Sequence, residues 1–372
     1  MTKKTIAIVL NASWNLFNFR LNLIRSIEKA GYKVVLIAPY DQYSDILKKE
    51  FTYHDIYISN QGTNPKEDIK TFIQFYRLYK HIKPDIVLHY TIKPNIYGTL
   101  ASYFLGIQCI NNIAGLGTLF IKHNFVTSIA KGLYKYSQSK ADKIFFQNAD
   151  DFKLFTDKGL VEKSKCDILP GSGVDLEKFK PVTTIKNDKV FRFLLISRML
   201  WDKGVKEYVE AAKIIKEKYP HVEFQLLGFL DVENKAAISK QQMDNWVDDD
   251  DVQYLGVSDH VQQEIAQADC IVLPSFYREG TPRTLLESAS MAKPIVTTDN
   301  VGCRDVVDDG INGFLCKTRD TGDLVQKLGM MLNLSVEERV QMGNKGREKM
   351  QRQFDEQFVI NKYLDAINKL CA

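Results

Sequence analysis

Residues 269–287, DCIVLPSFYREGTPRTLLE, join a short apolar run to a segment that begins like a helix. The run CIVLPS has no charged residue, which is typical of a strand that is buried on both faces of a parallel sheet. Thr281 precedes a proline, which disfavours helical geometry at that residue, so we expect Thr281 to cap a helix whose first residue is Pro282. The stretch therefore predicts one strand–loop–helix unit, with Glu279 in its loop and Glu287 inside its helix.

The same order of strand and helix recurs along the whole chain. Alternation of this kind predicts parallel sheets that are covered by helices on both faces. It is broken once, near residue 180, so we expect an α/β protein with two Rossmann-like, doubly wound domains, residues 1–180 and 181–372. We expect the last helix to pack back onto the first domain. The predicted strands are residues 5–10, 32–38, 85–90, 107–113, 142–147, 190–197, 222–228, 252–256, 270–275, 294–298 and 313–316.

Ligands bind at one particular edge of such sheets. They lie outside the carboxyl ends of the strands, which makes a crevice between the two domains the expected site. Arg198 directly follows a predicted strand, and Lys203 comes five residues later, just before Gly204 opens a helix. Two cations at a strand end and a helix start favour phosphate binding over a surface salt bridge.

The helix that follows Thr281 offers a second element for binding phosphate. Its first backbone N–H groups have no partner inside the helix and lie at the positive end of the helix dipole. We expect the N–H groups of Arg283, Thr284 and Leu285 to face a ligand. Gly280 would let that ligand approach the backbone closely.

Glu279 and Glu287 allow two interpretations. As a pair they could be the acid and base of a glycosidase, which needs carboxyl groups about 5–9.5 Å apart. Alternatively, each carboxylate accepts hydrogen bonds from the hydroxyls of a sugar-like ligand that lies across the helix end. The glycosidase hypothesis gives no reason for Arg198, Lys203 and a helix end suited to phosphate, so we favour the second interpretation.

Composition and charge restrict the class of partner. The chain has 372 residues, 45% hydrophobic and 26% charged, as in an ordinary globular protein. Residues 1–180 contain 25 Lys and Arg against 16 Asp and Glu, a net charge of +9, whereas residues 181–372 contain 25 against 30, a net charge of −5. The basic first half favours an anionic partner: a phosphate ester, a nucleic acid or an anionic membrane surface.

Other patterns argue against several classes. No run approaches the ~20 apolar residues of a membrane helix, and the apolar run at residues 6–10 is too short for a signal peptide. The six cysteines form no C-x-x-C pair, so neither zinc nor a disulfide framework is indicated. The acidic run at residues 248–251 is interpreted as a solvated turn. We therefore expect a cytoplasmic protein with no metal.

Three stretches of the second half resemble one family. EGTPRTLLE (279–287) is similar to the E-x7-E signature of the family 4 glycosyltransferases, SRMLWDKG (197–204) to their S-R-[LM]-x-x-x-K-G element, and VGCRDVVDDGINGFLC (301–316) to the stretch that follows. These are retaining sugar-nucleotide enzymes with the GT-B fold. The first half resembles members that build bacterial surface polysaccharides and lipid-linked oligosaccharides, among them N-acetylgalactosaminyltransferases acting on undecaprenyl-diphospho-bacillosamine. The stretches concerned are NLFNFR (15–20), HYTIKP (89–94), IAGLGTLF (113–120) and LPGSGVDLEKF (169–179).

The resemblance implies a role for each donor-side residue. Arg198 and Lys203 would hold the donor diphosphate and stabilise the charge on the leaving nucleotide, with no metal or other cofactor in the chemical step. Glu279 would bind hydroxyls of the transferred sugar, and Glu287 the ribose. The backbone of residues 281–285 would contact the phosphate and the sugar.

Two positions depart from the family pattern. Thr281 stands where many relatives have a larger apolar residue, and Arg283 where a small or polar residue is common. Both bear on the choice of donor.

The first domain is expected to bind the acceptor. His89 ends a predicted strand and is the leading catalytic candidate there, contacting the donor sugar or the acceptor hydroxyl, although a histidine after a strand is often structural. The GLG element at residues 115–117 is either a backbone contact to the ligand or a turn. The other acceptor-side candidates are Asn15, Asn18, Thr91, Lys93, Gly115 and Gly117.

Residues 120–143 form a separate candidate for membrane contact. Phe125, Ile129, Leu133 and Tyr136 follow helical spacing, and five lysines accompany a single aspartate. Such a helix either lies on an anionic membrane or packs on the core with its lysines in solvent.

We therefore expect a retaining glycosyltransferase at the inner face of the cytoplasmic membrane. It would move an N-acetylhexosamine or hexose from a UDP-sugar to a polyprenyl-diphosphate-linked sugar, with no nucleic-acid partner. One rival is a GT-B sugar-nucleotide epimerase, which would need further acidic or histidine groups. Another is a non-catalytic nucleotide-sugar sensor, which turnover would distinguish.

Overall fold

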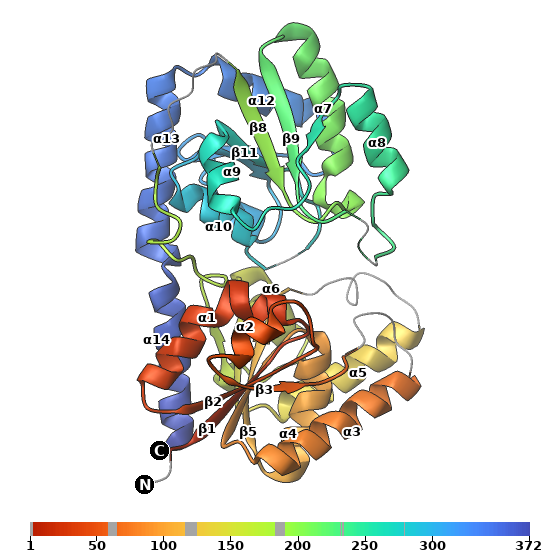
Figure 1. The fold of residues 1–372 in the computed structure, drawn as a ribbon, viewed down its shortest axis with the longest axis vertical. Helices are drawn as coiled ribbons and strands as arrows, with labels where there is room; N and C mark the ends of the chain where they lie inside the picture. The colour runs from red at the N-terminus through yellow and green to blue at the C-terminus, as the bar shows by residue number, and fades with distance from the viewer. Residues whose placement is uncertain are drawn as a thin grey trace. The chain divides into compact units, whose positions relative to one another are not determined.

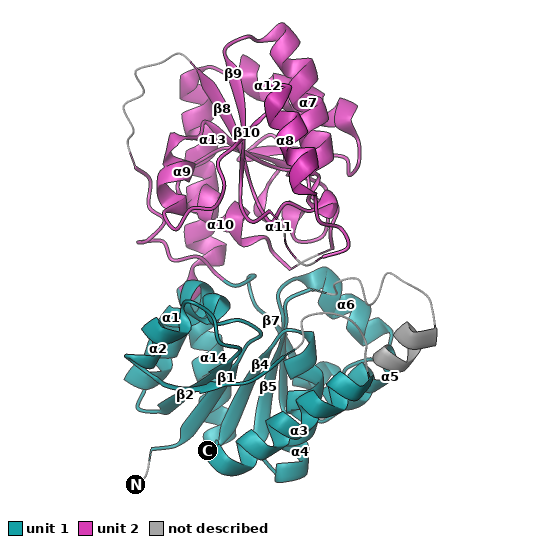
Figure 2. Cartoon of the chain, turned by 45° about the vertical axis from the view of Figure 1, so that its right-hand side comes forward, with its two compact units in different colours: residues 1–172, 357–372 teal, residues 173–356 magenta. Residues whose placement is uncertain are grey.

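The computed structural model describes residues 3–58, 65–115, 125–182, 190–230, 232, 234–278 and 280–372 (Figure 1). The chain forms two compact units (Figure 2). Unit 1 comprises residues 1–172 and 357–372, and unit 2 comprises residues 173–356. The chain therefore changes units at residue 173, whereas the sequence pattern places the change near residue 180.

The strands of unit 1 are β1 (Thr5–Val9), β2 (Lys33–Ala38), β3 (Thr52–Asp55), β4 (Ile86–Tyr90), β5 (Gln108–Ile113), β6 (Lys143–Phe146) and β7 (Cys166–Ile168). They form one parallel sheet in the order β3-β2-β1-β4-β5-β6-β7. Strand β1 pairs with both β2 and β4, and Ala7 lies opposite Val35 on one side and Val87 on the other. The strand order reverses between β1 and β4, and doubly wound sheets bind ligands at such a point.

Helices cover both faces of this sheet. On one face, Leu23 and Ile27 pack in the same core as Ile367 of the last helix, and on the other face Phe75 shares a core with Phe155. The end of the chain thus packs on the first sheet (Figure 1). The helices of unit 1 are α1 (Ser13–Lys29), α2 (Ser44–Lys48), α3 (Pro65–Ile82), the π-helix η1 (Pro94–Gly98), α4 (Thr99–Leu105), α5 (Phe125–Ser139), α6 (Ala149–Asp157), the 3-10 helix η3 (Lys163–Lys165) and α14 (Glu356–Cys371).

Unit 2 has a second parallel sheet. Its strands are β8 (Phe191–Ile196), β9 (Val222–Leu227), β10 (Gln253–Tyr254), β11 (Cys270–Leu273), β12 (Ile295–Thr298) and β13 (Gly313–Cys316). Their order is β10-β9-β8-β11-β12-β13, so the reversal falls between β8 and β11. The helices are η4 (Trp201–Lys203), α7 (Val205–Lys218), α8 (Lys240–Asp248), α9 (Val261–Gln267), α10 (Arg283–Ser290), α11 (Cys303–Val306), α12 (Thr321–Asn333), α13 (Val336–Lys349) and the π-helix η5 (Met350–Phe354).

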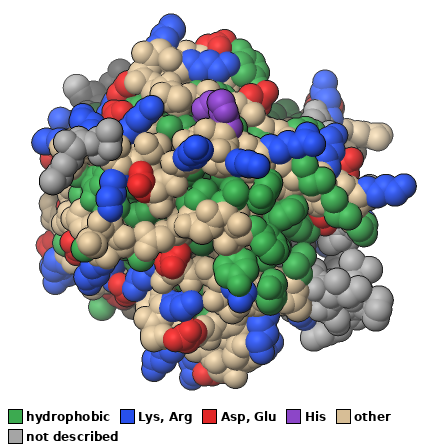
Figure 3. All heavy atoms as spheres, turned by 90° about the horizontal axis from the view of Figure 1, so that it is seen from below, with side chains coloured by type: hydrophobic (Ala, Val, Ile, Leu, Met, Phe, Trp, Pro, Cys, Tyr) green, Lys and Arg blue, Asp and Glu red, His purple; other side chains and the backbone are tan. Residues whose placement is uncertain are grey.

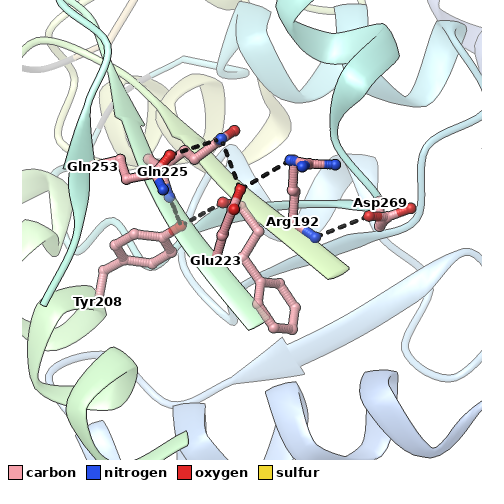
Figure 4. A network of polar contacts seen from close by, with 7 residues as sticks. Arg192, Tyr208, Glu223, Gln225, Gln253 and Asp269 are labelled. Atoms are coloured by element: carbon pink, nitrogen blue, oxygen red, sulfur yellow. Dashed lines mark hydrogen bonds and ion pairs between the residues drawn. The ribbon is translucent and has the colours of Figure 1, made fainter. Parts of the chain in front are cut away.

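A polar network ties the strands of unit 2 together at their amino ends (Figure 4). Arg192 Nε donates to Glu223 Oε2 at 2.9 Å, and the Arg192 backbone N–H donates to Asp269 Oδ2 at 2.8 Å. The backbone N–H of Gln225 donates to the Tyr208 hydroxyl at 3.2 Å. Arg192, Glu223 and Asp269 lie near the starts of β8, β9 and β11, at the edge opposite the one where ligands bind, so we infer that the network stabilises the sheet.

The predicted fold is confirmed: two Rossmann-like units, each with a parallel sheet. The sequence does not predict two short strands, β3 (TYHD) and β7 (CDI). Both are too short, and contain too few apolar side chains, to form a recognisable apolar run. Both strands lie at an edge of the sheet. Among the described residues, no helix combines the length and apolar character needed to cross a membrane.

Candidate functional site

Two loops of unit 2 meet at the point where its strand order reverses. The loop after β8 and the loop after β11 are joined by the carbonyl oxygen of Asp202, which accepts the backbone N–H groups of Phe276 at 3.1 Å and Tyr277 at 3.0 Å. A Cβ added to Gly204 would lie 2.1 Å from the Pro274 carbonyl oxygen, so the loops approach too closely for any side chain there. Gly204 also has a φ of 76°, which glycine adopts without strain.

This junction holds Lys203 beside the second loop. Lys203 is 7% exposed, and its Nζ lies 5.4 Å from the centre of the Tyr277 ring. Arg198, by contrast, is exposed at the end of β8. The two residues that are predicted to bind phosphate therefore lie in one short loop, where Lys203 is buried and Arg198 is exposed.

Helix α10 begins one residue later than the sequence predicts. Pro282 has a ψ of 121° and is the N-cap, so it is not the first helical residue, and Thr281 is not the cap. The Leu285 N–H donates to the Pro282 carbonyl at 3.1 Å. The prediction that the Leu285 N–H faces a ligand is therefore wrong, because that group already closes the first turn. Gly280 and Thr281 are buried in front of this turn.

Glu287 lies in a buried ion pair with Arg283. Arg283 Nε lies 2.7 Å from Glu287 Oε1, and the two side chains are 12% and 10% exposed. Burial raises the pKa of Glu287, while the charge of Arg283 and its hydrogen bond lower it, with a further contribution from Lys178. The sequence indicated Arg283 only as an unusual residue, and the structure adds its partner. Glu279 lies outside the described residues.

His89 is inside unit 1. It is 0% exposed, its Nε2 lies 3.0 Å from the Tyr79 hydroxyl, and its Nδ1 lies 3.0 Å from Asn111 Oδ1. Gly98 packs so closely on the ring that a Cβ there would lie 2.5 Å from Nε2. Burial lowers the pKa of His89 to about 4. These contacts correct the prediction of a catalytic His89: both ring nitrogens are engaged in the interior, so we assign it a structural role.

Other acceptor-side candidates also bond within their own unit. Lys93 Nζ lies 3.0 Å from Asp68 Oδ1 in a mostly buried pair, which corrects the expectation that Lys93 faces a ligand. Asn15 Nδ2 donates to Asn11 Oδ1 at 3.2 Å, and Asn18 Nδ2 donates to the Trp14 carbonyl at 3.1 Å.

Thr91 and Gly115 have unusual backbone conformations. Thr91 has a φ of 67°, which is strained for a β-branched residue, and Gly115 has a φ of 127°. Glycine adopts such a φ without strain, whereas strained residues such as Thr91 concentrate at functional sites. Gly117 lies outside the described residues.

The described part of helix α5 departs from the predicted apolar stripe at one position, Tyr136. Of the predicted apolar stripe, Leu133 packs against the core, but Tyr136 is 50% exposed, and Tyr134 is the buried tyrosine. Lys140 Nζ lies 5.2 Å from the Tyr136 ring and 4.6 Å from the ring of Tyr103 in α4. The side chains of residues 120–130 lie outside the described part of the chain.

No group of three or more His, Cys, Asp or Glu side chains that could hold a metal ion occurs among the described residues. The arrangement suits a ligand with a phosphate and hydroxyl groups, because Lys203, Arg198 and Glu287 offer both kinds of partner.

Comparisons with known proteins identify glycosyltransferases as the relatives of this chain. Residues 190–333 match the family described as "Glycosyl transferases group 1", and residues 5–148 match "Glycosyl transferase 4-like". The chain is 28% identical, over 98% of both chains, to N,N'-diacetylbacillosaminyl-diphospho-undecaprenol alpha-1,3-N-acetylgalactosaminyltransferase of Campylobacter jejuni. It is 26% identical, over 70% of both chains, to UDP-Gal:alpha-D-GlcNAc-diphosphoundecaprenol alpha-1,3-galactosyltransferase of Escherichia coli.

Solved structures share the fold. A glycosyltransferase from Rickettsia africae superposes with a TM-score of 0.80 at 18% identity, covering 100% of this chain and 99% of the other. HepE from Anabaena, solved with UDP and glucose, gives a TM-score of 0.77 at 16% identity, covering 98% of this chain and 99% of the other.

Proposed function

Because this chain belongs to the family 4 glycosyltransferases of the GT-B fold, as its motifs predicted, we propose that it transfers an N-acetylhexosamine from a UDP-sugar to a hydroxyl of an undecaprenyl-diphosphate-linked sugar. The observation that carries the donor half is the junction of the loops after β8 and β11, which brings Lys203 to the loop that leads into α10. The acceptor half is supported by the names of the two relatives, both of which act on diphospho-undecaprenol-linked sugars.

Each donor-side residue has a proposed task. Lys203 and Arg198 hold the diphosphate and stabilise the charge that develops on the leaving UDP, which requires no metal. Glu287 accepts hydrogen bonds from the ribose hydroxyls, and Glu279 does the same for the transferred sugar. The acceptor hydroxyl attacks on the face from which the UDP leaves, so the configuration is retained, and a phosphate oxygen of the leaving UDP accepts the hydroxyl proton.

Contact with the membrane is proposed for unit 1. Tyr103, Phe104 and Tyr136 are 47%, 60% and 50% exposed, and Lys140 lies against two of these rings. Figure 3 views the chain from below and shows hydrophobic side chains next to many lysine and arginine side chains. Aromatic and basic side chains together suit the interface of an anionic membrane. We propose that the protein works at the inner face of the cytoplasmic membrane.

A panel of nucleotide sugars tests the proposal. Purified protein is mixed with UDP-linked hexoses and N-acetylhexosamines and with GDP-mannose as the control donor, and both thermal stabilisation and slow release of UDP are followed. One or more UDP-sugars should raise the melting temperature and release UDP faster when a lipid-linked acceptor is added. Stabilisation without any turnover would instead indicate a nucleotide-sugar sensor, and inversion at C2 of the free sugar nucleotide would indicate an epimerase.

A further inference from the structure

Arg20 places a positive charge inside unit 1 without a carboxylate partner among the described residues. Its side chain is 7% exposed, and its Nε has no hydrogen-bond partner there. The guanidinium lies over the ring of Tyr90, with 4.6 Å from Cζ to the ring centre. A buried cation loses its hydration and ordinarily gains a carboxylate or a bound anion in return. The contact with an aromatic face offsets only a part of that loss.

The charge lies where a doubly wound sheet binds its ligand. Arg20 is on α1, the helix that follows β1, and Tyr90 is the last residue of β4. Strands β1 and β4 are the neighbours between which the order of the sheet reverses. The carboxyl ends of the strands at such a reversal form the usual ligand site.

Neutral polar side chains surround this point. The rings of Tyr90 and Tyr363 are 6.0 Å apart, and Asn112 Nδ2 donates to the Tyr363 hydroxyl at 2.9 Å. Gln147 Nε2 donates in turn to Asn112 Oδ1 at 3.1 Å. Burial raises the pKa of both Tyr90 and Tyr363, so neither phenol is ionised and neither supplies the missing negative charge.

Thr91, the residue after the end of β4, provides independent evidence for a binding site. Thr91 follows Tyr90 directly and has a φ of 67°, a strained conformation for a β-branched residue. Its Oγ1 is buried and has no hydrogen-bond partner among the described residues. A strained backbone that presents an unsatisfied hydroxyl is typical of a binding site rather than of a packing position.

We propose that Arg20 and Thr91 bind a phosphate oxygen of the diphosphate that links the acceptor sugar to its lipid. This inference rests on the proposed function, because the acceptor supplies the phosphate. A guanidinium and a hydroxyl are both hydrogen-bond donors that suit an anionic oxygen. The site would hold the acceptor by its charged end and leave the sugar hydroxyl free to reach the donor.

The test compares Arg20→Gln, Arg20→Met and Arg20→Lys with Arg25→Gln. Arg25 lies on the same helix but is 52% exposed and paired with Glu50, which makes it a matched control. Arg20→Gln should raise the KM for the lipid-linked acceptor ~10–100-fold, the range expected for a lost hydrogen bond to a charged group, with a change below ~3-fold in the KM for the UDP-sugar. Arg20→Lys should recover part of the loss, and Arg25→Gln should change neither KM.

Thermal melting separates binding from packing. Arg20→Met should keep or raise the melting temperature of the free protein, because an apolar side chain of similar length replaces a buried charge that has no carboxylate partner among the described residues. A lower melting temperature together with an acceptor KM within ~3-fold of wild type would overturn the proposal, since Arg20 would then serve only to pack on Tyr90.

Inorganic pyrophosphate distinguishes the source of the phosphate. If it stabilises the wild type and not Arg20→Gln, a free diphosphate fills the site. If only the lipid-linked acceptor stabilises the wild type more than Arg20→Gln, the site requires a diphosphate that carries its lipid or sugar. Either result supports the proposal. If the wild type turns over no UDP-sugar at all, the proposed function is wrong. The proposal for Arg20 is then still supported if pyrophosphate raises the melting temperature of the wild type and not that of Arg20→Gln. It is wrong if pyrophosphate raises both melting temperatures equally or raises neither.

Discussion

Arg283 Nε donates a 2.7 Å hydrogen bond to Oε1 of Glu287, one turn further along α10. Both side chains are mostly buried. Burial raises the pKa of Glu287 above its ordinary value of 4.5, and the charge of Arg283 opposes this rise. Arg283 therefore acts on the proposed ribose site through Glu287, by favouring the ionised carboxylate that hydroxyl groups require as an acceptor.

Arg283→Met should shift the acid limb of UDP binding to higher pH. Without the guanidinium, burial raises the pKa of Glu287 further, so the carboxylate is protonated at a pH where the wild type is still ionised. Calorimetric dissociation constants for UDP between about pH 5 and 8 would show weaker binding by the variant at the acid end, approaching the wild type as the pH rises. Arg304→Met, at an exposed arginine, is the control. Superimposable pH profiles would mean that Glu287 does not bind the ribose.

Glu287→Gln should also change how stability depends on pH. Because the folded protein binds a proton at Glu287 more tightly than the unfolded chain does, the free energy of unfolding falls as pH rises from about 4.5 through the raised pKa. The variant lacks this titration, so its urea-unfolding curves should show a flatter decline over that window. A steeper decline in the variant would contradict the direction of the shift.

Substitutions of Glu279 and Glu287 should affect different steps, sugar transfer and UDP binding. Glu279→Ala should abolish transfer and spare most of the UDP affinity, because the proposed contacts of Glu279 are with the transferred sugar. Glu287→Ala should mainly weaken UDP, by about tenfold or more, the loss expected for a charged hydrogen bond of ~1.5–3 kcal/mol. UDP affinities are measured by calorimetry and transfer by product formation. Equal losses of UDP affinity in the two variants would refute the assignment.

The places of the donor-side candidates in the fold could be predicted because their signals are local. An apolar run marks β11, and Arg198 and Lys203 follow β8 within one short loop. The start of α10 was misplaced by one residue because Pro282 has a ψ of 121°, which residue preferences alone do not fix. The contact of Asp202 with Phe276 and Tyr277 joins residues far apart in the chain, and no sequence pattern marks it.

The surroundings of the acceptor-side candidates were harder to predict because their contacts are distant in sequence. His89 is enclosed by Tyr79 of α3 and Asn111 of β5, so its burial follows from the packing of three elements. Arg20, by contrast, has a signal in the sequence. It shares the buried face of α1 with Leu23 and Ile27, and a cation on an apolar helix face calls for an explanation.

Gly204→Ala should destabilise unit 2 and weaken the donor site. A Cβ at residue 204 would lie 2.1 Å from the Pro274 carbonyl oxygen, whereas one at Gly256, with nearly the same φ of 75°, meets nothing within 4 Å. Both alanine variants therefore lose stability because alanine disfavours a positive φ, but only Gly204→Ala also has a steric clash. Gly204→Ala should cost about 1–3 kcal/mol more than Gly256→Ala in urea unfolding and should raise the KM for the donor. Equal costs would show that the two loops are not held together tightly.

Phe104→Ser combined with Tyr136→Ser should reduce binding to anionic vesicles. Both rings are at least half exposed, and each would lose its insertion into the lipid interface. Co-sedimentation with phosphatidylglycerol vesicles should fall several-fold, and binding of the wild type should weaken with salt because the lysines act through charge. Val340→Ser, at an exposed valine of unit 2, is the control. Salt-insensitive binding, or none by the wild type, would remove the proposed membrane contact.

His89→Gln should flatten the pH dependence of stability without removing a limb from the pH profile of transfer. The folded pKa of His89 is about 4, below its ordinary value of 6.5, so the unfolded chain binds a proton first as the pH falls. The free energy of unfolding should therefore drop between about pH 6.5 and 4, and His89 accounts for up to about 3 kcal/mol of that drop. His221→Gln, at an exposed histidine, is the control variant. If His89→Gln instead removes a transition near neutral pH from the kcat profile, His89 takes part in proton transfer and its structural assignment is wrong.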